Sequence, residues 1–136
     1  MKLVIDASVN LKWILGAEEP DAGRAEALLA AIAAGEHRIF QPPHWFAEVL
    51  SVLASKRTHR IEETFNILQA IPHELCTNIQ IYRDAARLSV QLKHHLFDTL
   101  YHAVAKEHGA ALITADDAYF AKAYRLGNIK LLTNFI

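Results

Sequence analysis

Short apolar runs that alternate with helical segments constrain the fold of this chain more than any other feature of its sequence. We expect five strands, at residues 2–6, 37–41, 73–76, 110–114 and 129–132. Short runs that are apolar on both faces are typical of strands buried in a parallel sheet. Because helices separate the strands, the pattern predicts an α/β fold, a three-layer α/β/α sandwich with a central parallel sheet.

Helical periodicity and helix-terminating residues fill the segments between the expected strands. Pro20 and Pro43 suit first helical turns, where a missing N–H costs little. Gly16 and Gly109 suit the residue that follows a helix, and Ser8 is placed to cap the first helix. We therefore expect helices at residues 9–15, 20–34, 43–53, 61–71, 79–93, 97–108 and 117–126.

The length of the chain sets its domain organisation. Its 136 residues fit one domain, residues 1–136, because single hydrophobic cores typically serve about 100 to 150 residues. With 52% hydrophobic residues, the chain can fill a core on both faces of a sheet. No apolar run approaches the roughly 18 to 20 residues that span a bilayer, and the N-terminus leads directly into a strand. We therefore expect a cytoplasmic protein that does not contact membranes.

Charge, cysteine and histidine content exclude some classes of function. A formal net charge of −1 creates no overall field that attracts nucleic acid, so affinity for RNA must come from local patches or a metal ion. Cys76 is the only cysteine, which excludes an intramolecular disulfide, argues against a cysteine zinc site and indicates a core residue. The histidines, including His94 and His95, lack the spacing of a transition-metal motif and are expected at the surface or in loops.

Four acidic residues occupy positions that suggest a common site. Asp6 ends the first expected strand and Asp116 follows the fourth, and the crevice of an open parallel sheet lies outside the carboxyl ends of its strands. Asp98 lies in the first turn of its helix, and Glu48 lies among apolar residues of the helix after Pro43. Each acid alone could cap a helix or point outward. Together they would repel one another unless a cation were bound.

An oxygen-only ligand set indicates a hard divalent cation. Mg²⁺ prefers octahedral oxygen coordination and binds a few carboxylates together with substrate phosphate, and Mn²⁺ can substitute for it. Such a site suits phosphoryl transfer, because the metal activates water and stabilises charge on the phosphate. Ser8 and Thr114 are expected to support the carboxylates through their hydroxyl groups. Asp117, directly after Asp116, is a further candidate for assisting a second metal ion.

Four segments of the chain resemble the motifs of the PIN domain, in particular its VapC-like toxin branch. They are residues 4–9, 42–49, 97–105 and 112–116. They occur in the family's order and cover the whole chain. The resemblance implies a PIN-like fold in which Asp6, Glu48, Asp98 and Asp116 are the catalytic and metal-binding acids, with Thr114 beside the last. Thr99 and His102 depart from the alanine and aliphatic residue that are more usual in the family.

The resemblance also implies an activity and partners. It predicts a magnesium-dependent endoribonuclease that cuts structured RNA such as tRNA, acts as a toxin, forms a homodimer and is inhibited by a small antitoxin. Apolar positions on two successive helices also suggested a dimer surface, although all could belong to the core: Leu50, Leu53, Ile61, Phe65 and Leu68. Lys56, Arg57 and Arg60 form a basic cluster, and His102 follows Asp98 by one turn. These four residues are the candidate RNA contacts.

Three alternatives remain open from the sequence. A catalytically inactive PIN scaffold that binds a partner would keep the same fold. A magnesium-dependent phosphatase of the haloacid dehalogenase type also ends its first strand with aspartate, but it needs a second aspartate where this chain has Ser8. A phosphoacceptor receiver domain needs paired acids near the first strand and a lysine after a late strand, and neither is evident.

The aromatic residues fit core or dimer packing better than base stacking with RNA. They are Trp13, Trp45, Phe46 and Phe65.

Overall fold

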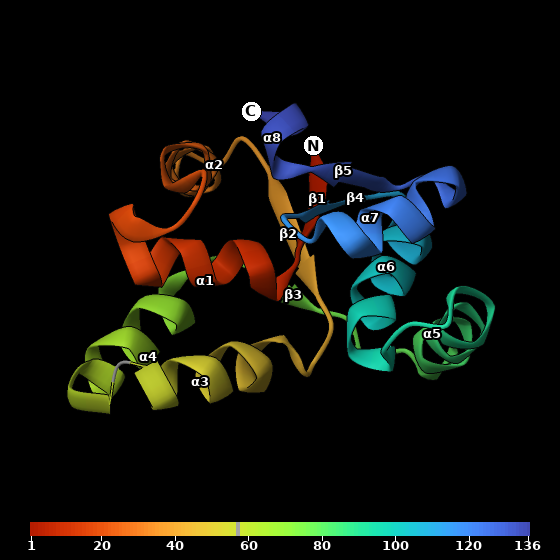
Figure 1. The fold of residues 1–136 in the computed structure, drawn as a ribbon, viewed down its shortest axis with the longest axis horizontal. Helices are drawn as coiled ribbons and strands as arrows, with labels where there is room; N and C mark the ends of the chain where they lie inside the picture. The colour runs from red at the N-terminus through yellow and green to blue at the C-terminus, as the bar shows by residue number, and fades with distance from the viewer. Residues whose placement is uncertain (57) are drawn as a thin grey trace.

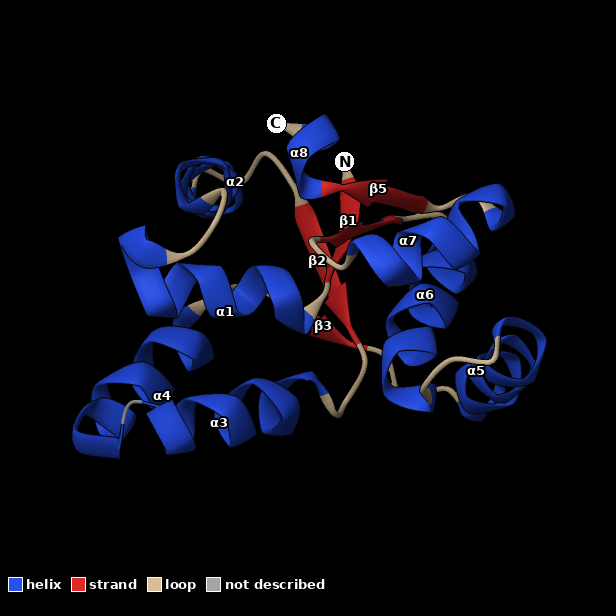
Figure 2. Ribbon diagram, viewed as in Figure 1, coloured by secondary structure: helices blue, strands red, loops and turns tan. Residues whose placement is uncertain are grey.

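A five-stranded parallel sheet forms the centre of the molecule in the computed structural model, which describes residues 1–56 and 58–136. The strands are β1 (Lys2–Ile5), β2 (Arg38–Gln41), β3 (Glu74–Leu75), β4 (Ala111–Thr114) and β5 (Ile129–Leu131). Their order is β3-β2-β1-β4-β5, and each neighbouring pair is parallel. Figure 2 shows the sheet between two groups of helices. The predicted three-layer sandwich is confirmed.

Helices connect the strands and cover both faces of the sheet. They are α1 (Ala7–Leu15), α2 (Ala22–Ala33), α3 (Trp45–Lys56), α4 (Ile61–Ala70), α5 (Ile79–Leu92), α6 (Leu96–His108), α7 (Asp117–Ala123) and α8 (Leu132–Phe135). Three 3₁₀ turns complete the chain: η1 (Gly16–Glu18), η2 (Thr58–Arg60) and η3 (Tyr124–Leu126). In Figure 1, α1 to α4 lie on one side of the sheet and α5 to α7 on the other. None of the helices in the described part of the chain is long and apolar enough to cross a membrane.

Several element boundaries differ from the sequence prediction. The prediction that Ser8 caps the first helix is wrong, because α1 begins at Ala7 and Asp6 occupies the N-cap position. The helix predicted through residue 126 ends at Ala123 and tightens into η3. The short C-terminal helix α8 was not predicted. The prediction for the end of α6 is confirmed: Gly109 has a left-handed φ of 61° and its N–H caps the Ala105 carbonyl.

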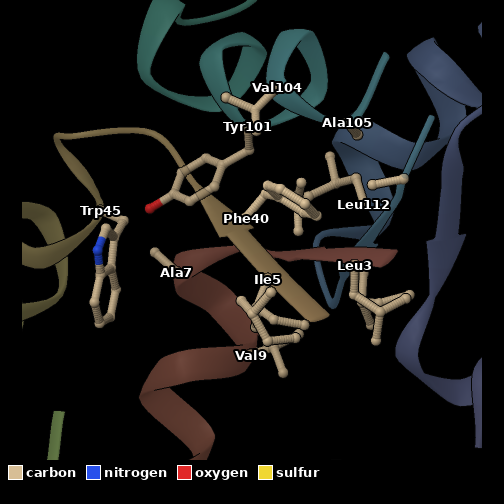
Figure 3. Close-up of a cluster of buried hydrophobic side chains, with 14 of the residues drawn as sticks. Leu3, Ile5, Ala7, Val9, Phe40, Trp45, Tyr101, Val104, Ala105 and Leu112 are labelled. Carbon is tan, nitrogen blue, oxygen red and sulfur yellow. The ribbon is translucent and has the colours of Figure 1, made fainter. Parts of the chain in front are cut away.

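The hydrophobic core lies on both faces of β1 and β4. Figure 3 shows Ile5 and Val9 below the sheet and Tyr101 and Leu112 above it. Cys76 is buried, as predicted. Of the apolar residues suggested for a dimer surface, Leu53 and Leu68 are fully buried and so belong to the core. Leu50 and Ile61 pack against the core, while Phe65 is 39% exposed.

At the carboxyl end of β1, side chains take the place of backbone hydrogen bonds to β2, which pairs with β1 only at Lys2 and Leu3. Gln41 accepts from the Ile5 N–H at 3.2 Å and donates to the Ile5 carbonyl at 3.0 Å. Asn10 donates to the carbonyls of Ile5 and Asp6. Because these buried groups are paired, the backbone at Asp6 is fixed where β1 turns into α1.

Candidate functional site

Asp6 lies at the centre of the site, between the end of β1 and the start of α1. Its side chain is only 8% exposed. One carboxylate oxygen, Oδ2, accepts hydrogen bonds from Ser8 Oγ at 2.5 Å and from Thr114 Oγ1 at 3.0 Å. The first turn of α1 and the end of β4 therefore determine the orientation of this carboxylate. The predicted contact of both hydroxyl groups with an acid is present in the structure.

The same hydroxyl groups connect Asp6 to Asp116. Ser8 Oγ accepts from the Ala115 N–H and Thr114 Oγ1 accepts from the Asp116 N–H, each at 3.0 Å. Asp116 caps α7, because its Oδ1 accepts from the Tyr119 N–H at 3.0 Å. Asp116 therefore has the capping role that the sequence left open. This hydrogen bond also fixes the Asp116 carboxylate beside the end of β4.

Asp98 lies in the first turn of α6 and makes a contact that the sequence did not predict. Its Oδ2 accepts from His94 Nε2 at 2.7 Å. Ligand atoms of His94, Asp98 and Asp116 all lie within 4.8 Å of one another, close enough to share a metal ion. The assignment of His94 to the surface or a loop missed this contact, which only its spacing four residues before Asp98 could have suggested.

His94 bridges Lys122 and Asp98. Its Nδ1 lies 3.2 Å from Lys122 Nζ, and its Nε2 lies 2.7 Å from Asp98 Oδ2. His94 therefore orients the Asp98 carboxylate from the turn that precedes α6.

Glu48 completes the group of four acids from the first turn of α3. His44 Nε2 lies 3.2 Å from Glu48 Oε2, but the same nitrogen hydrogen-bonds to the Phe97 carbonyl at 2.9 Å. Within the described residues, Glu48 Oε2 is a buried oxygen without a hydrogen-bond partner, and so is the Tyr101 hydroxyl. Figure 3 shows this hydroxyl directed toward the space between Trp45 and Ala7, at the start of α1.

The carboxylates influence one another electrostatically. Burial raises the pKa of Asp6 from 3.8 to about 6, the Ser8 and Thr114 hydroxyl groups oppose this, and Asp98 and Glu48 raise it further. Burial also raises the pKa of Asp98, against the effect of His94, and Glu48 and Asp116 add to the increase. The structure therefore brings all four predicted acids together.

The donor set fits a hard divalent cation. Carboxylate oxygens are the ligands that Mg²⁺ and Mn²⁺ prefer, and a cation would relieve the repulsion between Asp6, Asp98 and Glu48. The unpartnered Glu48 Oε2 and Tyr101 hydroxyl are polar atoms whose desolvation is uncompensated in the protein alone. A bound ion with its waters would supply the missing partners.

Two other predicted site residues have different surroundings. Asp117 is exposed and lines a cavity of about 240 Å³ together with Lys12 and Thr114. The prediction that His102 contacts RNA is wrong: it is fully buried, and its nitrogens hydrogen-bond to the Tyr119 hydroxyl at 2.9 Å and the Gly127 carbonyl at 2.8 Å.

The predicted basic cluster lies at the far end of α3. Lys56 is the last residue of α3 and Arg60 ends η2, and both are exposed. At about 1.5 Å per residue, Lys56 is roughly 12 Å along the helix from Glu48. Arg57 lies outside the described residues. The structure does not bring Lys56 and Arg60 to the acids.

Comparisons with known proteins agree with the fold. The profile of the PIN domain matches residues 3–126. No curated protein matches the sequence significantly. A chain of VapBC2 from Rickettsia felis, in a complex with a promoter DNA fragment, has a TM-score of 0.70 at 17% identity and covers 96% of this chain and 97% of its own. VapC20 from Mycobacterium tuberculosis, described as a toxin that cleaves the sarcin-ricin loop, has a TM-score of 0.67 at 17% identity, with 88% and 94% covered. A chain of VapBC-1 from nontypeable Haemophilus influenzae has a TM-score of 0.68 at 15% identity, with 98% and 99% covered.

Proposed function

Because this chain belongs to the PIN domain family, we propose that it is a divalent-metal-dependent endoribonuclease and the toxin of a toxin–antitoxin pair. One observation carries the proposal of metal-dependent chemistry. Four acids from four separate parts of the chain converge at the carboxyl end of the sheet, and burial and mutual repulsion raise the pKa of Asp6 to about 6. A cluster of this kind destabilises the metal-free protein, and a role in binding a cation accounts for it.

The residues of the site have distinct roles in this proposal. Asp6 and Asp98 are the principal ligands of Mg²⁺, or of Mn²⁺ in its place, and Glu48 and Asp116 complete or orient the site. When bound, the metal activates water and neutralises charge on the phosphate that is cleaved. Ser8 and Thr114 hold the Asp6 carboxylate in place.

The proposed substrate is structured RNA, such as tRNA, in the cytoplasm. The similar protein VapC20 is described as cleaving the sarcin-ricin loop, which is consistent with this substrate class. The net charge of −1 means that the fold as a whole does not attract RNA. Recognition therefore depends on the metal and on local basic groups.

The proposed partners are a second copy of this chain and a small antitoxin. Phe65 is 39% exposed on α4 and lines an open groove of about 340 Å³ with Leu50 and Ile61. This groove supports the proposal of an apolar protein contact. Two of the similar structures are named as VapBC complexes, which supports an antitoxin partner. We expect that partner to place an Arg or Lys near the acids, where it would compete with the metal.

Cleavage of total tRNA tests the proposed activity. The wild type should cleave in Mg²⁺ or Mn²⁺ and not in excess chelator, and Asp6→Asn should lose most of its turnover. Glu107→Gln is a matched control, because it removes an exposed acid at the opposite end of α6 from Asp98. Circular dichroism would show that the variants are folded. Equal cleavage in chelator, or an active Asp6→Asn protein, would reject the mechanism, and an inactive wild type would favour the scaffold alternative.

A further inference from the structure

A basic cavity lies directly beside the acids. Its volume is about 570 Å³, and it is lined by Ser89, Lys93, His94, His95, Leu96 and Lys122. None of these lining residues is acidic. The cavity is formed by the end of α5, the turn into α6, and α7. Figure 1 shows these three helices grouped on one side of the sheet.

Local structure fixes the shape of this cavity. Lys93 ends α5 in a left-handed conformation, with a φ of 52°, so the chain reverses direction there. Ser89 Oγ donates to the His94 carbonyl, and Lys122 Nζ donates to the Lys93 carbonyl at 3.0 Å. The turn between α5 and α6 is therefore attached to both α5 and α7. The positions of the basic groups follow from this attachment.

The two lysines of the cavity form none of the ion pairs found among the described residues. The Lys93 side chain is exposed, and the polar contacts of Lys122 are with the Lys93 carbonyl and a ring nitrogen of His94. Two lysines that line one cavity and are not paired with a carboxylate are a suitable place for an anion.

A single side chain joins the cavity to the acids. His94 faces Lys122 through Nδ1 at 3.2 Å and Asp98 through Nε2 at 2.7 Å. The Lys122 ammonium and the Asp98 carboxylate are therefore separated by the width of one imidazole ring. An anion bound by Lys122 and a metal ion bound by Asp98 would be close neighbours.

We propose that this cavity binds a backbone phosphate of the RNA substrate, adjacent to the phosphate at the metal centre. The inference rests on the proposed function, because it identifies the anion as part of the RNA that is cut. Lysine is well suited to this contact, since a compact ammonium recognises phosphate as a point charge without reading sequence. Lys93 and Lys122 thus take the role that the sequence assigned to Lys56 and Arg60, which lie at the far end of α3.

Binding of labelled tRNA, measured by fluorescence anisotropy, tests the assignment. Measurements in excess chelator prevent metal-dependent cleavage, so they do not depend on activity. Lys93→Gln and Lys122→Gln should each weaken binding several-fold and lower the slope of log Kd against log salt by about one. Lys2→Gln is the matched control, because Lys2 is exposed at the opposite end of β1 from Asp6. It should bind RNA with the affinity and salt slope of the wild type.

The outcomes separate this inference from the proposed function. Wild-type affinity and salt slope in Lys93→Gln and Lys122→Gln would overturn the phosphate site, whether or not the protein cleaves RNA. Weaker binding in both variants with no cleavage by the wild type would support the site and reject the nuclease. Lys122→Gln loses two contacts and could disturb the turn, whereas Lys93→Gln removes only an exposed side chain. A wild-type result for Lys93→Gln would therefore overturn its role even if Lys122→Gln failed to fold.

Discussion

Replacing Asp6 with asparagine should stabilise the metal-free protein while removing its main metal ligand. The pKa of Asp6 is raised from 3.8 to about 6, chiefly by burial. At about 1.4 kcal/mol for each pH unit, the ionised carboxylate lowers the free energy of unfolding by about 3 kcal/mol at neutral pH.

The sign of the pH dependence follows from the direction of this change in pKa. The folded state holds the Asp6 proton more tightly than the unfolded state does. The contribution of Asp6 to stability is therefore complete below the unfolded pKa of 3.8 and is lost as the pH rises through the folded pKa of about 6. Asparagine cannot ionise, so this loss should be absent in Asp6→Asn. Its amide oxygen can still accept from Ser8 and Thr114.

Urea unfolding in excess chelator, from pH 4 to pH 8, measures the effect. Asp6→Asn should match the wild type near pH 4 and exceed it by about 3 kcal/mol at pH 8. Added Mg²⁺ should then stabilise the wild type and leave Asp6→Asn unchanged. The control Glu107→Gln should follow the wild type throughout. An Asp6→Asn protein that is less stable than the wild type at pH 8 would show that the carboxylate is stabilising and would refute the reasoning.

Three further predictions concern packing and assembly. Tyr101→Phe removes a buried hydroxyl without a partner and should raise the free energy of unfolding of the metal-free protein by about 1 kcal/mol in urea; a decrease would mean that the hydroxyl is hydrogen-bonded. Leu53→Ala should cost about 2–5 kcal/mol, because Leu53 is fully buried, and a cost below 1 kcal/mol would place it outside the core. If α4 forms the dimer contact, light scattering at tens of micromolar should give a dimer for the wild type and a monomer for Phe65→Glu; a dimer in both would exclude this surface.

The parallel sheet could be predicted because its central strands are buried on both faces. Leu3, Val4 and Ile5 are fully buried in β1, and this apolar run is visible in the sequence. The edge strand β3 has only two residues, both exposed, so its length could not be predicted from hydrophobicity. Helix α8 spans four residues and has no helical periodicity to detect.

Asp6 and Asp116 could be predicted because topology alone places them at one edge of the sheet, whereas Glu48 and Asp98 lie on helices and were expected from the motifs that they share with the family. The contacts of the histidines could not be predicted in this way. His94 contacts Lys122, which is 28 residues later in the sequence, and this contact depends on how α7 packs. His102 lies four residues after Asp98, which suggested that it faces the same pocket. In α6, however, its side chain hydrogen-bonds to Tyr119 and Gly127. Local spacing places a residue on a helix without specifying the neighbour that it faces.

Calorimetric titration with Mn²⁺ tests most directly whether the four acids form a metal site. The wild type should bind Mn²⁺, and Asp98→Asn should lose the binding signal, because it removes a ligand charge while keeping the volume of the side chain. The control Glu107→Gln should bind Mn²⁺ as the wild type does. Wild-type affinity in Asp98→Asn and Asp6→Asn, or no binding to the wild type, would contradict the metal site.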